Sequence, residues 1–209
     1  MLKIWGRTNS VNVQKVLWCC DELSLPYERI DAGMQYGRNH EPEYLAMNPN
    51  GKIPVIEDGD YMLWESNAIV RYLAMQYGSP ANNLYPDDPK VRAGVDRWLD
   101  WSLSTLQPAD RPVFVGMIRT PKEKRDMAAI QAAAGEAAKL WQIVEAHLKG
   151  RHYLEGGAFS LADMVIGAFC RRYIELDGIE RPSLPLVQEW YARLKARPAF
   201  QRHIAPTLS

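Results

Sequence analysis

The first part of the chain alternates short strand-like runs with segments of helical periodicity. Residues 2–5 and 27–30 are strand-like, and residues 11–23 between them place apolar side chains at helical spacing. This pattern predicts a β-α-β unit. Residues 53–57 and 61–63 are two further strand-like runs with a turn signal, Asp-Gly-Asp, between them, which is typical of a hairpin.

An amphipathic stretch follows the hairpin and stops at Gly78. The segment before the hairpin, residues 33–51, shows no clear period. The predicted order of this half is β-α-β-α-β-β-α, and we expect it to form an α/β domain over residues 1–79.

The local composition changes at residues 79–89, SPANNLYPDDP, where turn-forming residues dominate. We assign residues 80–89 to a linker and residues 90–209 to an all-α domain. Helical patterns occupy residues 90–119, 121–149, 160–175, 186–196 and 199–204. Pro108 and Pro112 each remove a backbone donor from the first of these helices, which should bend or break there and form one wall of a cleft.

Ser160 and Asp163 have the spacing of a capping box at a helix start. Phe159 and Met164 flank them as a hydrophobic staple. The pair is interpreted as a folding signal and not as a catalytic Ser-Asp pair.

The composition of the chain limits which binding partners and which cellular location we expect. The 209 residues are 47% hydrophobic, enough for a substantial core, and 25 basic residues balance 25 acidic ones. No net field draws the chain to nucleic acid or an anionic membrane, and we expect neither as a partner. With no signal-like or membrane-spanning stretch, the expected location is the cytoplasm.

The three cysteines are Cys19, Cys20 and Cys170. They show neither metal-ligand spacing nor a C-x-x-C pair, so we expect reduced, buried thiols and no metal site.

Three polar segments carry candidate chemistry. GRTNSVN joins the first strand to the first helix, where side chains meet unsatisfied backbone donors. NPNGKIPV places Pro54 before a strand, in a tight bend that would expose the backbone of Ile53. Glu65 and Ser66 begin a helix, where a hydroxyl and free amides suit a carboxylate and Glu65 suits an amine. Together they suit a zwitterionic peptide.

NPNGKIPV followed by ESNAIVRYLA, inside this order of elements and ahead of a helical half, resembles the glutathione transferase family over essentially the whole chain. The resemblance implies a thioredoxin-like first domain, glutathione as co-substrate and a homodimer. It is greatest to bacterial members related to the theta and phi groups, which use serine at the end of the first strand.

Carried over by position, the resemblance implies that Glu65 and Ser66 bind the γ-glutamyl end of glutathione and that Ile53 and Pro54 clamp its cysteinyl part. Lys52 and His40 match contacts to the glycyl carboxylate, although the loop that holds His40 varies in length within the family.

The resemblance implies that the catalytic position lies among Thr8, Asn9, Ser10 and Asn12. We select Ser10, with Asn12 second, because S-x-N resembles the serine-type pattern. The hypothesis is that Ser10 donates to the glutathione sulfur and lowers its pKa. The second substrate is expected between this loop and the first long helix, against Arg111 and Phe114.

Other functions on the same fold remain open. A glutathione-dependent isomerase, dehalogenase, peroxidase or disulfide reductase would share the thiol site, and a binding or regulatory protein could reuse the scaffold. The intact polar helix starts favour catalysis, and the absence of a tyrosine or cysteine from the catalytic loop favours conjugation over disulfide chemistry.

Overall fold

A computed structural model describes residues 1–206 and residue 208. Its N-terminal half contains a four-stranded sheet of order β2-β1-β3-β4. The strands are β1 (Leu2–Trp5), β2 (Tyr27–Ile30), β3 (Val55–Asp58) and β4 (Tyr61–Trp64). β1 runs parallel to β2 and antiparallel to β3, and β3 and β4 form the predicted hairpin.

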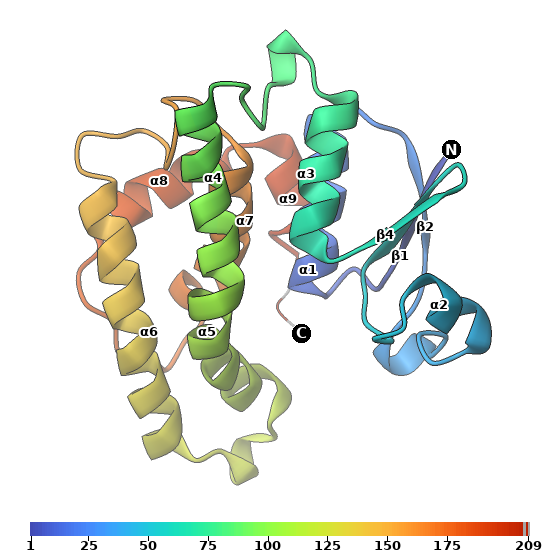
Figure 1. The fold of residues 1–209 in the computed structure, drawn as a ribbon. Helices are drawn as coiled ribbons and strands as arrows, with labels where there is room; N and C mark the ends of the chain where they lie inside the picture. The colour runs from blue at the N-terminus through green and yellow to red at the C-terminus, as the bar shows by residue number, and fades with distance from the viewer. Residues whose placement is uncertain (207, 209) are drawn as a thin grey trace.

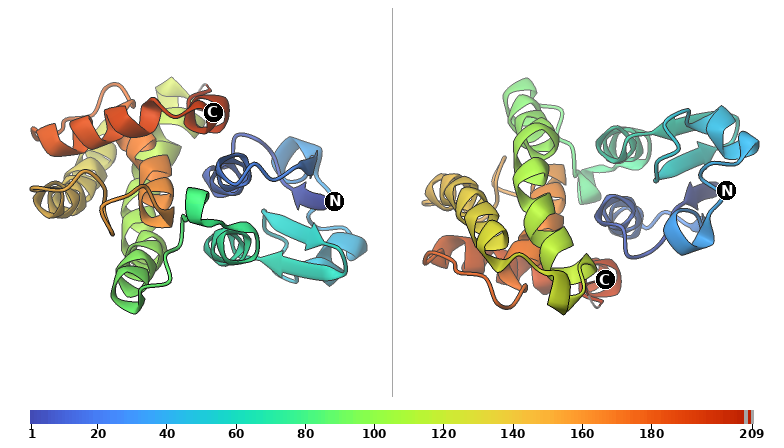
Figure 2. Two further views of the ribbon diagram at one scale, coloured as in Figure 1. Left: turned by 90° about the horizontal axis from the view of Figure 1, so that it is seen from above. Right: turned by 90° about the horizontal axis from the view of Figure 1, so that it is seen from below.

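The helices of this half follow the predicted order. They are α1 (Val11–Glu22), the 3₁₀ helix η1 (Met34–Tyr36), α2 (Pro42–Met47) and α3 (Ser66–Tyr77). Figures 1 and 2 show α1 and α3 between the sheet and the helical half of the chain. Both helices place buried aliphatic side chains in the large core cluster, which spans the two halves. The site at their N-termini therefore lies where the halves meet.

The second half is helical in the described residues. Its elements are η2 (Pro80–Asn82), α4 (Pro89–Trp101), η3 (Ser102–Leu106), α5 (Gln107–Phe114), η4 (Val115–Arg119), η5 (Lys122–Lys124), α6 (Met127–His147), α7 (Leu161–Ile174), α8 (Pro185–Lys195) and α9 (Pro198–His203). None of the helices described is long and apolar enough to cross a membrane.

The predicted break in the first long helix is confirmed, because a wider π-helical segment interrupts it before α5 and another follows α5. Pro108 lies in the first turn of α5 and Pro112 lies inside the helix. Both therefore lack the backbone N–H donor, as expected from the sequence. One boundary prediction is wrong: the next helix was expected from residue 121. It begins at Met127, because Asp126 caps it by accepting a hydrogen bond from the Ala129 amide at 3.0 Å.

Candidate functional site

The start of α1 brings Ser10 to the end of β1. Gly6 makes this possible, since a Cβ there would lie 2.4 Å from Val13 Cγ2, and the turn packs directly against the helix. Ser10 is the N-cap residue and its carbonyl accepts from the Gln14 amide at 2.8 Å. Its hydroxyl makes no capping hydrogen bond and its side chain is buried. The hydroxyl is thus available to a bound group beside the first amides of the helix.

Asn12 lies in the first turn of the same helix. Its Oδ1 is buried and has no hydrogen-bond partner in the part of the chain described. A buried amide oxygen without a partner is uncommon, and it favours a donor from a ligand at this point.

Two side chains fix the bend before β3 by hydrogen bonds to its backbone. The Lys52 carbonyl accepts from the Tyr44 hydroxyl and from Asn48 Nδ2, each at 2.8 Å. The Ile53–Pro54 peptide bond is cis, and β3 begins at the next residue. Within the described residues, the N–H and carbonyl of Ile53 join no backbone hydrogen bond outside the helices and strands. They are free to pair with another extended chain.

A single residue, Glu65, links β4 to α3. Its φ of 71° is unusual for a residue with a side chain, and it turns the chain directly from strand to helix. Ser66 follows as the first helical residue and is buried, whereas Glu65 is exposed. The turn therefore places a hydroxyl, a carboxylate and first-turn amide groups at one edge of the sheet.

These segments border one cavity of about 470 Å³. The predicted site residues that line it are Ser10, Asn12, Lys52, Ile53, Pro54, Glu65, Ser66, Arg111 and Phe114. Of the predicted set, His40 does not line it. His40 is exposed, lies 3.0 Å from Asn39 Nδ2 through its Nε2, and stands against Gly51, which does line the cavity together with Asn39.

Four charged residues that line the cavity are not among the site residues selected from the sequence: Arg7, Asp110, Arg119 and Arg172. Burial raises the pKa of Asp110 to about 7, with Arg172 opposing the change. Burial lowers the pKa of Arg172 to about 10, with Asp110 opposing. Arg7 lies inside GRTNSVN, so its place next to Ser10 was a usable signal. Nothing in the local sequence indicates that Asp110 and Arg172 line the same cavity as Arg7.

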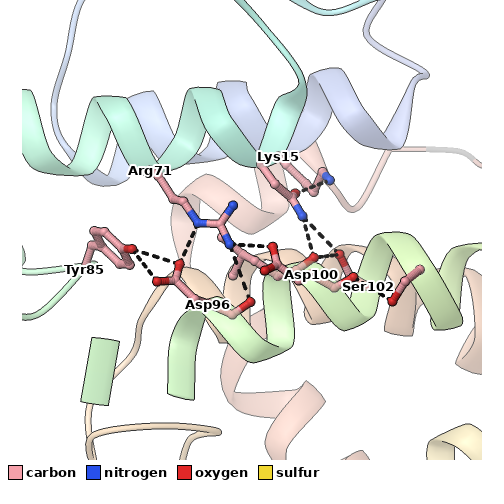
Figure 3. A network of polar contacts seen from close by, with 9 residues as sticks. Lys15, Arg71, Tyr85, Asp96, Asp100 and Ser102 are labelled. Atoms are coloured by element: carbon pink, nitrogen blue, oxygen red, sulfur yellow. Dashed lines mark hydrogen bonds and ion pairs between the residues drawn. The ribbon is translucent and has the colours of Figure 1, made fainter. Parts of the chain in front are cut away.

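A polar network supports the site from behind. Lys15 Nζ donates to Asn67 Oδ1 at 2.8 Å, and Asn67 Nδ2 donates to the Leu99 carbonyl at 2.7 Å and lies 3.1 Å from Ser102 Oγ. Figure 3 also shows a second set of contacts nearby, in which Arg71 of α3 forms an ion pair with Asp96 of α4, at 2.6 Å. The network ties the first turn of α3, which carries Ser66, to α4 of the helical half.

The three cysteines are buried, as predicted, and none lines the cavity that the described residues form. Burial raises the pKa of each thiol. Cys19, Cys20 and Cys170 therefore behave as small apolar core residues.

Two family models match the chain. The one described as "Glutathione S-transferase, N-terminal domain" matches residues 1–75, and "Glutathione S-transferase, C-terminal domain" matches residues 69–198. Among curated relatives, "Glutathione S-transferase GstB" of Escherichia coli (strain K12) is 44% identical over 204 residues, 97% of each chain. "Glutathione S-transferase 3" of Zea mays is 32% identical and covers 98% of this chain and 93% of its own.

Among solved structures, a theta class glutathione S-transferase from Xanthomonas axonopodis pv. citri with glutathione bound is 47% identical. It superposes with a TM-score of 0.94 and covers 100% of this chain and 99% of its own. The fold, the two matched domains and the identity over the full length agree, and the chain belongs to the glutathione S-transferase family.

Proposed function

We propose that this chain joins glutathione to a small electrophile, and that the Ser10 hydroxyl donates a hydrogen bond to the glutathione sulfur. The observation that carries the proposal is the Ser10 side chain itself. It is 8% exposed, lines the cavity at the N-terminus of α1, and makes no capping hydrogen bond. A buried hydroxyl with a spare proton suits a thiolate acceptor.

The other groups of glutathione are assigned to the positions predicted from the sequence. Glu65 and Ser66 would take the γ-glutamyl ammonium and carboxylate at the start of α3. The free backbone groups of Ile53, beside Pro54, would pair with the cysteinyl residue as an added strand. Lys52 would meet the glycyl carboxylate, and His40 stays a predicted contact to the same group. The relative that was solved with glutathione bound supports this co-substrate.

The required energy is within reach of one hydroxyl. A thiol with a pKa of about 8.5 must lose about 1.5 to 2 pKa units for half or more of it to be thiolate at neutral pH, which corresponds to about 2 to 2.7 kcal/mol. A hydrogen bond to a charged group contributes about 1.5 to 3 kcal/mol, and a helix N-terminus adds about 0.3 to 1 kcal/mol. The thiolate then attacks the electrophile directly, without a protein nucleophile or a metal.

The cavity favours conjugation over a mechanism that uses a protein thiol. None of its described lining residues is a cysteine, and the three thiols are buried elsewhere. Isomerisation, dehalogenation and peroxide reduction share the activated glutathione, so they differ from conjugation only in the second substrate.

We further propose a homodimer that works in the cytoplasm, with domain limits at residues 1–79 and 90–209 around a linker. Large apolar side chains on β4 and α3 stay exposed in the single chain, and they support a covered face: Tyr61, Met62, Trp64 and Met75. Light scattering coupled to gel filtration measures the mass directly. A monomer at all concentrations would contradict this part.

The test of the proposed function is an ultraviolet titration of bound glutathione in the wild type, Ser10→Ala and Asn12→Ala. Ser183→Ala, which removes an exposed hydroxyl outside the cavity, is the matched control. We expect the pKa of bound glutathione to fall by at least about one unit in the wild type and the control, and to return toward about 8.5 in Ser10→Ala. Full retention of the shift in Ser10→Ala would reject Ser10, and its loss in Asn12→Ala alone would assign the donor to Asn12.

A further inference from the structure

Four arginines from separate parts of the sequence line the end of the cavity between Ser10 and the helical half. They are Arg7 after β1, Arg111 in α5, Arg119 at the end of η4 and Arg172 in α7. The only carboxyls among the described lining residues are Glu65, at the start of α3, and Asp110. This end of the cavity therefore carries an excess of positive charge.

The arginines lack the partners that usually neutralise them. Among the described residues none of the four has a carboxylate oxygen within 4.0 Å. Arg7 is 8% exposed, and its Nε makes no hydrogen bond in the described part of the chain. A buried guanidinium N–H without an acceptor is costly unless a ligand supplies one.

An aromatic ring, and not an acid, holds two of these groups. The Arg172 guanidinium carbon lies 3.8 Å from the centre of the Phe114 ring, and that of Arg119 lies 5.3 Å from it. Stacking on a ring leaves the N–H edge of a guanidinium free to pair with a planar anion. We name Arg7, Arg119 and Arg172 the arginine cluster.

The arginines of this cluster repel one another. Burial is the main cause that lowers the pKa of Arg7, and the charge of Arg119 lowers it further. Burial also lowers the pKa of Arg172, and Arg119 and Arg7 both add to the effect. Asp110 compensates only in part, because burial raises the pKa of its carboxyl to about 7 and so favours the neutral form. An anion between the arginines would relieve this repulsion.

We propose that the second substrate is an electrophile that carries a carboxylate, and that the arginine cluster binds this carboxylate while Phe114 packs against the carbon frame. The inference rests on the proposed function and names its substrate class. For a halogenated substrate, the sulfur lone pair of glutathione forms the carbon–sulfur bond. The carbon–halogen bond breaks, and the halide leaves with its electron pair. The thiol proton has already passed to solvent, and the carboxylate is unchanged.

Two electrophiles of equal shape separate charge from reactivity: 4-chloro-3,5-dinitrobenzoate and 4-chloro-3,5-dinitrobenzamide. Both lose chloride from the same carbon, so kcat/KM for each is divided by its uncatalysed rate. We expect the wild type to prefer the benzoate by about tenfold or more, as one or two hydrogen bonds to a charge imply. The preference should shrink as salt is added.

Arg119→Gln is the first variant, because Arg119 is exposed and its loss leaves the core intact. We expect it to lower the preference for the benzoate by about tenfold, and Arg119→Lys to restore part of it. Arg7→Gln should act in the same direction. Arg151→Gln removes an exposed arginine outside the cavity and should keep the wild-type preference. An equal rate loss for both electrophiles in Arg119→Gln would overturn the inference.

Glutathione also has carboxylates, so its affinity is measured in the same variants by calorimetry. Weaker glutathione binding with an unchanged preference would overturn the inference, since the arginines would then serve the co-substrate. Ser10→Ala separates the two proposals: it should slow both electrophiles equally and keep the preference. Equal rates in Ser10→Ala and the wild type would reject the proposed function alone.

The inference is also tested without turnover. Calorimetry with unreactive 3,5-dinitrobenzoate should show binding to the glutathione-loaded wild type and about tenfold weaker binding to Arg119→Gln. No binding to the wild type, or equal binding to both proteins, would overturn it.

Discussion

Lys15 offers a direct test of the electrostatics at the junction of the two halves. It is fully buried in α1, and its Nζ donates to Asn67 Oδ1 at 2.8 Å and lies 5.6 Å from the centre of the Phe169 ring. Burial lowers the pKa of Lys15 from 10.5 to about 7, with Glu65 opposing the change and Arg172 adding to it. The perturbation is Lys15→Met, which keeps the length of the side chain and removes its charge.

The sign follows from the direction of the shift. A base whose pKa is lower in the folded protein adds stability above its unfolded pKa and loses it as pH falls through the folded pKa. One pKa unit corresponds to about 1.4 kcal/mol, so the shift of Lys15 amounts to about 5 kcal/mol in total. Between pH 9 and pH 7 the loss is about 2 kcal/mol.

The assay is urea unfolding at several pH values between 7 and 9 at one fixed protein concentration, followed by tryptophan fluorescence. The buried thiols complicate the wild-type curve, because raised thiol pKa values make stability fall as pH rises. We therefore compare free energies of unfolding of the wild type and Lys15→Met, in which the thiol contributions cancel. The wild type should gain about 2 kcal/mol relative to Lys15→Met from pH 7 to pH 9.

Lys15→Met also leaves Asn67 Oδ1 without its donor, which costs about 1 to 3 kcal/mol at every pH and shifts the whole difference curve by a constant. Only the slope of that curve is the test. Lys149→Met, at an exposed position, controls for the loss of one lysine charge. A difference between wild type and Lys15→Met that stays constant within about 0.5 kcal/mol from pH 7 to pH 9 would refute the reasoning.

Two further predictions concern the cap of α7 and the glutathione end of the cavity. Asp163 accepts hydrogen bonds from the Leu154 and Ser160 amides and from Trp190 Nε1, so Asp163→Ala should lower the free energy of unfolding by about 3 to 5 kcal/mol, measured by urea unfolding. Ser160→Ala should lower it by only about 1 kcal/mol. Equal losses in the two variants would contradict the larger role given to Asp163. Ser66→Ala should raise the KM for glutathione by about tenfold with kcat nearly unchanged, whereas a loss of kcat alone in steady-state kinetics would contradict a binding role.

The sequence predicts the elements that carry a strong period. α1 ends one residue before the predicted range, and α3 ends at Tyr77, directly before the predicted stop at Gly78, since their apolar stripes are continuous and helix-ending signals follow them. The segment before β3 shows no period from which the bounds of a helix can be predicted, because α2 spans only six residues. The capping box of Ser160 and Asp163 is confirmed, as a motif of four consecutive positions can be read directly.

The residues proposed for the thiol end of the candidate site can be selected from the sequence for a similar reason. Ser10, Ile53 and Ser66 lie at helix starts and at a bend, and each of these features is encoded within a few neighbouring residues. The arginine cluster is different, because residues 7, 119 and 172 meet only after both halves have folded together. No local pattern distinguishes Arg172 from a surface arginine in the last turn of a helix.

This difference in origin has a consequence for specificity. The end proposed to bind glutathione is built from two helix starts, the bend at Ile53 and the side chains of Ser10, Glu65 and Ser66, which a substitution on the facing helices leaves in place. The other end depends on Arg119 of η4 and Arg172 of α7, which both lie over the ring of Phe114 in α5. Exchanging Arg119 or Arg172 would thus change the charge preferred in the second substrate without moving Ser10. On the proposed roles, Ser10 and the two arginines of the helical half can be changed separately because different parts of the sequence carry them, whereas Arg7 lies in the same loop as Ser10.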